Sequence, residues 1–157
     1  MEVDEAKFGK WKFNTGRLVD GTWVFGGFKR GSKRCFLVPV LSRGADVLLD
    51  VINTWICPGT TVISDCWKAY DCLSDEGFEQ QSVNHSMNFV DPHSSAHTQN
   101  IERIWREVCG GIPHFGRKEK HMVGYLAEFL FKRQYLDYTE RLHAFYTAVG
   151  QLSSPAQ

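Results

Sequence analysis

The chain has 157 residues, 43% hydrophobic and 13% aromatic, which excludes a disordered protein and allows about one folded domain. Eighteen lysines and arginines balance 18 aspartates and glutamates, which excludes a protein that binds nucleic acid through its overall charge. With no secretory signal and no apolar run near the roughly 18 residues that cross a membrane, we expect an intracellular protein without a membrane partner.

The first third of the chain predicts strands followed by a helix. A first strand lies near Val3, and residues 23–28 and 35–41 are aromatic and β-branched runs separated by a basic Gly/Ser turn. These runs predict a hairpin beside the first strand. Apolar residues recur at helical spacing from Val47 to Trp55, so we expect a crossover helix that ends before Cys57-Pro58-Gly59.

The middle of the chain predicts a strand–helix–strand unit, and hence a parallel part of the sheet. Residues 60–64 form a short apolar strand that meets Asp65. A short helix over 67–73 and a strand over 78–83 follow, and the polar segment 84–99 is expected to be a loop.

The last third of the chain predicts helices. Residues 100–109 carry Ile101, Ile104, Trp105 and Val108 on one face, which is typical of an amphipathic helix. A long helical region follows, and its stripe of Met, Leu, Val and aromatic residues is expected to pack in the core: Met122, Tyr125, Leu126, Phe129, Leu130, Tyr138, Leu142, Phe145, Tyr146 and Val149. This order of elements predicts an α/β fold, a ribonuclease-H-like mixed five-stranded sheet flanked by helices. We expect one domain over 1–150 and a disordered tail over 151–157.

Three acids stand at the end of, or just inside, apolar elements: one of Asp4 and Glu5 on the first strand, Asp65 after the fourth, and Glu102 on the helix. Side chains of neighbouring strand residues point to opposite faces, so only one of Asp4 and Glu5 can face a shared site. Oxygen ligands of this kind suit Mg²⁺ or Mn²⁺, and two such ions promote cleavage of phosphodiesters. A zinc site built from some of the five cysteines with His93 or His97 stays an alternative, although the usual ligand spacing is missing.

Five strings in this order resemble the catalytic domain of DDE transposases of the ISXO-type insertion sequences and of their eukaryotic relatives, the Merlin elements. The strings are V-D-E-x-K-F-G, W-V-F-G-G, G-T-x-x-x-S-D-x-W-x-A-Y, V-N-H-S and H-T-x-N-I-E-x-x-W, and they lie between Glu2 and about Arg133. The resemblance implies metal-dependent cleavage and transfer of DNA strands. It implies that Asp4, Asp65 and Glu102 are the catalytic acids that hold two Mg²⁺ or Mn²⁺ ions, and that His97 and Asn100 line the same cleft.

Contacts with DNA must come from local basic residues, because the chain has no net charge. Relatives commonly have a lysine seven residues after the glutamate, where this chain has Cys109, and Arg106 is the cation that reaches the same side. The other candidates lie in two basic loops: Lys29, Arg30, Lys33, Arg34, Arg117 and Lys118.

The resemblance also implies transposon ends and target DNA as partners, and a homodimer or a larger synaptic assembly. Relatives usually carry an N-terminal DNA-binding region, which we expect to be absent here because the chain begins three residues before Asp4. In a eukaryotic host the protein would act in the nucleus. Two alternatives stay open: a domesticated, catalytically inactive DNA-associated or protein-interaction module, and a stand-alone ribonuclease-H-like nuclease acting on hybrids or junctions.

Overall fold

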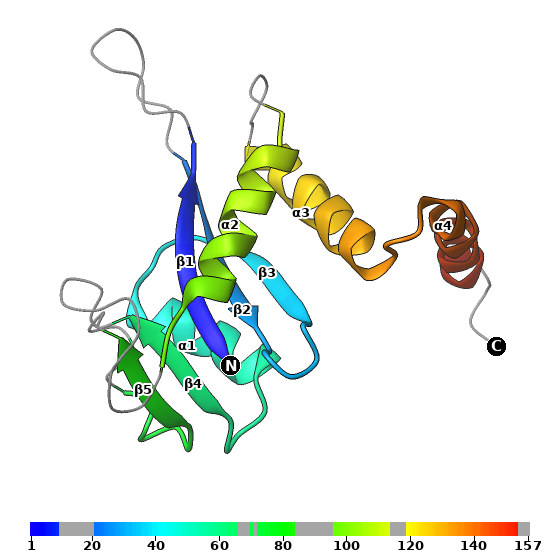
Figure 1. Ribbon diagram of the computed structural model, residues 1–157. Helices are drawn as coiled ribbons and strands as arrows, with labels where there is room; N and C mark the ends of the chain where they lie inside the picture. Colours follow the sequence, from blue (N-terminus) through cyan, green and yellow to red (C-terminus); the bar gives the residue numbers. More distant parts are fainter. Residues whose placement is uncertain (10–20, 66–69, 71, 84–95, 114–118, 154–157) are drawn as a thin grey trace, which may run out of the picture.

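A mixed sheet of five strands forms the centre of the molecule (Figure 1). The computed structural model describes residues 1–9, 21–65, 70, 72–83, 96–113 and 119–153. The strands are β1 (Glu2–Phe8), β2 (Thr22–Phe28), β3 (Cys35–Val40), β4 (Thr61–Asp65) and β5 (Glu79–Val83). Their order is β3-β2-β1-β4-β5, with the first three strands antiparallel and β4 and β5 parallel to β1. This topology confirms the predicted ribonuclease-H-like sheet.

Helices cover both faces of the sheet (Figure 1). They are α1 (Ala45–Trp55), α2 (Gln99–Gly111), α3 (Glu119–Gln134) and α4 (Tyr138–Ser153). One core cluster joins α1 to Val3, Phe25 and Phe36, and a second joins α2 and α3 to Phe8 and Val24. Because side chains alternate along a strand, the odd-numbered residues of β1 face α1 and the even-numbered ones face α2.

The stripe of apolar residues expected to pack in the core divides between two helices. On α3, Met122 and Leu126 are buried against α2 and the sheet, as predicted. On α4 the prediction is wrong, because the side chains of Tyr138, Leu142 and Tyr146 are 77%, 65% and 64% exposed.

The physical reason is a break in the predicted long helix. Asp137 accepts hydrogen bonds from the N–H and hydroxyl of Thr139 and starts a new helix, and Arg141 donates to the carbonyl of Tyr135 at the end of α3. The new helix lies beyond the end of α3, apart from the sheet (Figure 1). It runs to Ser153, three residues into the segment expected to be a tail.

The remaining predictions about elements have simple outcomes. The helix expected over 67–73 and the polar loop fall largely on residues outside the described part of the chain. Within the described ranges, none of the helices combines the length and the apolar character that crossing a membrane requires.

Candidate active site

Two of the predicted acids lie side by side on neighbouring parallel strands. Glu2 of β1 is paired with Ile63 of β4, so two residues further along both strands Asp4 lies beside Asp65. Side chains at matching positions of parallel strands point to the same face, and for this pair it is the face covered by α2. Asp65 is also the last residue of its strand, and ligand sites of open α/β sheets lie at such carboxyl ends.

Asp4 is a carboxyl group that has lost most of its water. Its Oδ2 accepts a hydrogen bond of 2.9 Å from the indole Nε1 of Trp105, and its Oδ1 accepts one of 2.8 Å from the backbone N–H of Glu5. Burial raises the pKa of Asp4 to about 7, with further increases from the charges of Glu5 and Asp65, while the two hydrogen bonds hold it down. Among the described residues, no cation forms an ion pair with Asp4 that would offset the free-energy cost of burying its charge.

Gly26 makes the contact between Trp105 and Asp4 sterically possible. It is the residue of β2 directly opposite Asp4, on the antiparallel side of β1. A Cβ atom at this position would lie 2.6 Å from Cη2 and 2.9 Å from Cζ2 of Trp105. The indole therefore occupies the space that a side chain would fill, and from there its N–H reaches the carboxylate.

Glu102 stands on the first turn of α2, three residues before Trp105 and so on the same side of the helix. Its Oε1 accepts a hydrogen bond of 3.0 Å from the hydroxyl of Thr98, a buried residue. Among the described residues, no three His, Cys, Asp or Glu side chains come close enough together to hold a metal ion. The described geometry thus brings Asp4 and Asp65 together and places Glu102 on the helix that covers them.

Glu5 faces the opposite side of the sheet from Asp4. Its Oε2 accepts a hydrogen bond of 2.6 Å from the hydroxyl of Tyr70, and its Oε1 is 3.9 Å from Nη1 of Arg43. Burial raises the pKa of Glu5, and the bond from Tyr70 opposes that increase. Tyr70 is fully buried, and burial and the neighbouring Glu5 raise the pKa of its hydroxyl. On this face the acid already has donors.

The two predicted cleft residues, His97 and Asn100, both lie against Glu2, a residue that the sequence reasoning missed. Asn100 donates its backbone N–H to Oε2 of Glu2 over 2.9 Å and its side-chain Nδ2 to Oε1 over 2.6 Å. Nδ1 of His97 is 3.6 Å from the same Oε1. Glu2 is two residues before Asp4, so the alternation of strand residues was the signal that placed it on the same face.

The candidate DNA contacts differ in whether their side chains are exposed to solvent or already bonded within the protein. Lys29, Lys33 and Arg34 are exposed in the turn between β2 and β3, and Arg106 is exposed on α2. Arg30 is engaged instead: its Nε donates to Glu2 over 2.7 Å, and its Nη2 donates to the carbonyl of His97 over 2.6 Å. The remaining candidates, Arg117 and Lys118, lie outside the described residues.

Trp105, Thr98 and Gly26 have roles at this site that the sequence did not reveal. The sequence placed Trp105 in the core, and its side chain is indeed buried, but nothing in the helical spacing showed that its N–H would bind Asp4. A serine or threonine just before a helix normally caps it by accepting a hydrogen bond from a backbone N–H of the first turn. The hydroxyl of Thr98 makes no such bond and donates to Glu102 instead.

Comparison with known proteins places most of the chain in one family. The model of a family described as "ISXO2-like transposase domain" matches residues 4–134. A protein of Haemophilus influenzae described as an "uncharacterized transposase-like protein" is 26% identical over 96 residues, which cover 60% of this chain and 76% of that protein. The matched region runs from Asp4 to the end of α3 and contains Asp4, Asp65 and Glu102.

Proposed function

Because the chain belongs to the ISXO2-like transposase family, we propose that it is a DDE-type catalytic domain that cuts DNA strands and joins them elsewhere. The observation that carries the proposal is the pair of neighbouring carboxyl groups, Asp4 and Asp65, on the face of the sheet covered by α2. Glu102, on that helix, is the proposed third acid. The stand-alone nuclease would use the same acids, so hybrid, junction and duplex substrates compared side by side separate the two activities.

The donor atoms at the site fit a hard divalent cation. Carboxylate oxygens are the ligands that Mg²⁺ and Mn²⁺ prefer, and Asp4, Asp65 and Glu102 are the residues that would hold them. Asp4 is desolvated beside two other carboxyl groups, so a cation would relieve both the burial and the repulsion. When two such ions are bound, they supply activation of a water or 3′-hydroxyl and stabilisation of the leaving oxygen.

The residues of this chain have separate tasks in the proposed reaction. Asp4 and Asp65 provide a rigid pair of ligands because both stand on strands of the central sheet. Trp105 orients the Asp4 carboxylate through its N–H, and Thr98 orients that of Glu102. Exposed Lys29, Lys33, Arg34 and Arg106, together with Arg117 and Lys118, are the proposed contacts to the phosphates of transposon ends and target DNA. We also propose a homodimer or larger assembly as the form that pairs two ends.

The test is a calorimetric titration of the chain with Mn²⁺ and Mg²⁺, followed by nicking of a supercoiled plasmid in Mn²⁺. The Asp65→Asn variant should lose at least about tenfold in metal affinity and should not nick DNA, because one of the paired carboxylates is gone. The matched control is Asp50→Asn, which changes an exposed acid on α1 and should bind metal as the unchanged chain does. Equal binding and nicking by the unchanged chain and Asp65→Asn would contradict the proposal.

A second function has one observation in its favour. The described residues contain no assembled group of three metal-ligating side chains, which is the state expected of a domesticated module without catalysis. That function predicts no metal binding by any variant, and an unchanged fold and unchanged partner binding when Asp4, Asp65 and Glu102 are all replaced by amides. Loss of cellular function in the triple variant would exclude it.

A further inference from the structure

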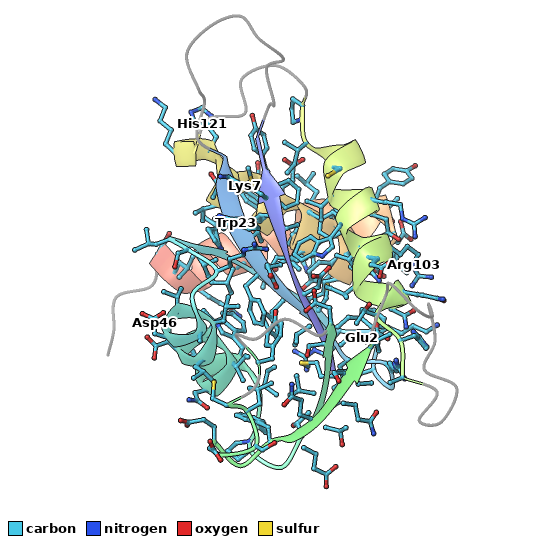
Figure 2. The ribbon with its side chains drawn as sticks, turned by 90° about the vertical axis from the view of Figure 1, so that its left-hand side faces the viewer. Glu2, Lys7, Trp23, Asp46, Arg103 and His121 are labelled. Carbon is cyan, nitrogen blue, oxygen red and sulfur yellow. The ribbon has the colours of Figure 1, made fainter. Side chains whose placement is uncertain are left out.

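The start of α2 is held by a charged residue from another element. Glu2 is fully buried, and its Oε2 accepts hydrogen bonds from the backbone N–H groups of Asn100 and Ile101 over 2.9 and 3.1 Å. Helix starts usually find such an acceptor in their own N-cap side chain, but Thr98, the N-cap of α2, makes no cap bond. Figure 2 shows Glu2 at the foot of β1, next to the first turn of α2. The cap of this helix therefore comes from a residue about a hundred positions earlier.

Both oxygens of Glu2 are occupied by donors. Besides the two backbone N–H groups on Oε2, Oε1 accepts from Nδ2 of Asn100 over 2.6 Å and from Nε of Arg30 over 2.7 Å. A carboxylate offers about four acceptor positions, and here four donors fill them. Glu2 is thus satisfied within the protein, and its surroundings do not leave it free to act as a ligand of the proposed metal ions.

A second bond joins the same two elements one turn further on. Asp4 accepts from the indole of Trp105, just as Glu2 accepts from Asn100 and Ile101. Two residues of a strand rise about 6.6 Å, and four residues of a helix rise about 6 Å, so the two bonds fit a helix and a strand that run in the same direction. Glu102 lies between these two fixed points on the helix.

We infer that Glu2 is a positioning residue of the site, which fixes the first turn of α2 on β1 and thereby sets where Glu102 stands relative to Asp4. The inference rests on the proposed function, because it assigns Glu2 a task through Glu102. Apolar packing holds α2 against the sheet but sets no exact orientation, and the Trp105 bond adds a polar contact one turn beyond Glu102. The bonds to Glu2 fix the orientation of the first turn, and Thr98 then holds the Glu102 carboxylate on that turn.

The test compares Mn²⁺ titrations of the unchanged chain, Glu2→Gln, Glu102→Gln and the double variant. Glutamine keeps the volume of Glu2 but removes its charge and turns one acceptor oxygen into an N–H₂ donor, so it cannot accept from all four donors at once. We expect Glu2→Gln and Glu102→Gln each to weaken Mn²⁺ binding by about tenfold or more, and the double variant to be no weaker than either.

The coupling between the two positions separates a positioning role from a merely structural one. If Glu2 were only a structural cap, its replacement would lower the melting temperature, and its effect on Mn²⁺ affinity would not depend on Glu102. The fold-losses in Mn²⁺ affinity of the two single variants would then multiply in the double variant. Multiplied losses, or Glu2→Gln binding Mn²⁺ like the unchanged chain, would overturn the inference. Asp137→Asn is the matched control, because it alters a carboxylate that caps α4 far from the site and should leave Mn²⁺ binding unchanged.

Backbone amide exchange gives a readout that needs no metal. In the unchanged chain the N–H groups of Asn100 and Ile101 should exchange slowly, and Glu2→Ala, which removes both acceptor oxygens, should speed their exchange by about tenfold or more relative to that of Val108 in the same helix. Unchanged exchange at both amides would overturn the inference. If the unchanged chain binds no Mn²⁺, the proposed function fails, and the exchange result still decides whether Glu2 fixes the helix.

Discussion

Helices α2 and α4 both carry an apolar stripe, yet only the stripe of α2 is buried. Ile101, Ile104 and Val108 of α2 are fully inaccessible to solvent, whereas Leu142 and Phe145 of α4 are 65% and 52% exposed. The apolar side chains of α2 gather on one face of the helix much more sharply than those of α4, so the spacing itself favours burial of α2. The two helices also differ in the contacts that tie each of them to the rest of the molecule.

The polar contacts of α2 are made with the sheet, and those of α4 are made with the preceding helix, α3. α2 is bound by Glu2 and Asp4 of β1, which lie about a hundred residues away. α4 is bound to the end of α3 through Arg141, and Phe145 contacts the ring of Phe131 at 6.5 Å between centroids. The buried helix is thus the one that is also bonded to the sheet, and the exposed helix is bonded to its neighbour in the chain.

The largest effect should come from truncating the buried stripe. Ile104→Ala should lower the free energy of unfolding by about 2–5 kcal/mol, because it leaves a cavity between α2 and the sheet. The same truncation on α4, Leu142→Ala, should change it by about 0.5 kcal/mol or less, since that side chain is largely in water. Urea denaturation of both variants measures the difference, and similar losses would mean that α4 is packed in solution.

The next effect is a dependence of stability on pH, expected at Asp4 beneath α2 and not at Asp137 before α4. Because the pKa of Asp4 is raised to about 7, the folded chain binds a proton between about pH 4 and 7 that the unfolded chain releases, so stability falls as the pH rises through that range. In the presence of a chelator, Asp4→Asn should therefore gain stability towards pH 8, by up to about 4 kcal/mol, and gain nothing at pH 4.

The control for this prediction is at the start of α4. Hydrogen bonds from Thr139 lower the pKa of Asp137, so Asp137→Asn should show no gain between pH 4 and 8. Thermal or urea melts at pH 4, 6 and 8 measure both variants. A gain for Asp4→Asn that does not depend on pH would show that burial of a charge is not what strains this site.

A smaller effect is expected from filling the space opposite Asp4. Gly26→Ala puts a methyl group 2.6 Å from the Trp105 ring, which forces the indole and the first half of α2 away from β2. We expect a loss of about 1–3 kcal/mol, as for other overpacked cores. Gly31→Ala, in the open turn between β2 and β3, has nothing within 4 Å and serves as the control in urea denaturation. Equal stability of the two variants would contradict the close contact of α2 with β2.

The smallest effect concerns the indole bond itself. Trp105→Phe removes the N–H that lowers the pKa of Asp4, so the pKa should rise further. Since Mn²⁺ binding needs the ionised carboxylate, the pH at which binding is half-maximal should move up by about one unit or less. Titrations at pH 6, 7 and 8 measure the shift, and Trp55→Phe, on the exposed side of α1, should cause none.

Features that depend on local geometry could be predicted from the sequence, and features that depend on distant contacts could not. Strand alternation and the order of elements were enough to predict the five-stranded sheet and the amphipathic helix over Ile101, Ile104 and Val108. They were also enough to predict that Asp4 and Glu5 face opposite sides, because that depends only on local geometry. The assignment of Asp4, Asp65 and Glu102 as metal ligands stays a prediction.

Long-range contacts account for what could not be predicted. The capping of α2 by Glu2 and the binding of Asp4 by Trp105 join residues 98 and 101 positions apart, and no local pattern encodes such partners. The helix break at Asp137 did have a local signal, since aspartate is a favoured residue at the start of a helix, where its carboxylate accepts from an N–H of the first turn. The spacing of apolar residues on both sides of it hid that signal.

The same long-range bonds have a consequence for the timing of folding. A ribosome releases β1 about a hundred residues before α2, and contacts this far apart in sequence form slowly. Until α2 arrives, Glu2 has no helix to cap, and Glu102 is absent from the sheet. Whatever chemistry the three acids support therefore begins only once α2 has docked on the sheet, so an unfinished chain would carry the strands of the site without its activity.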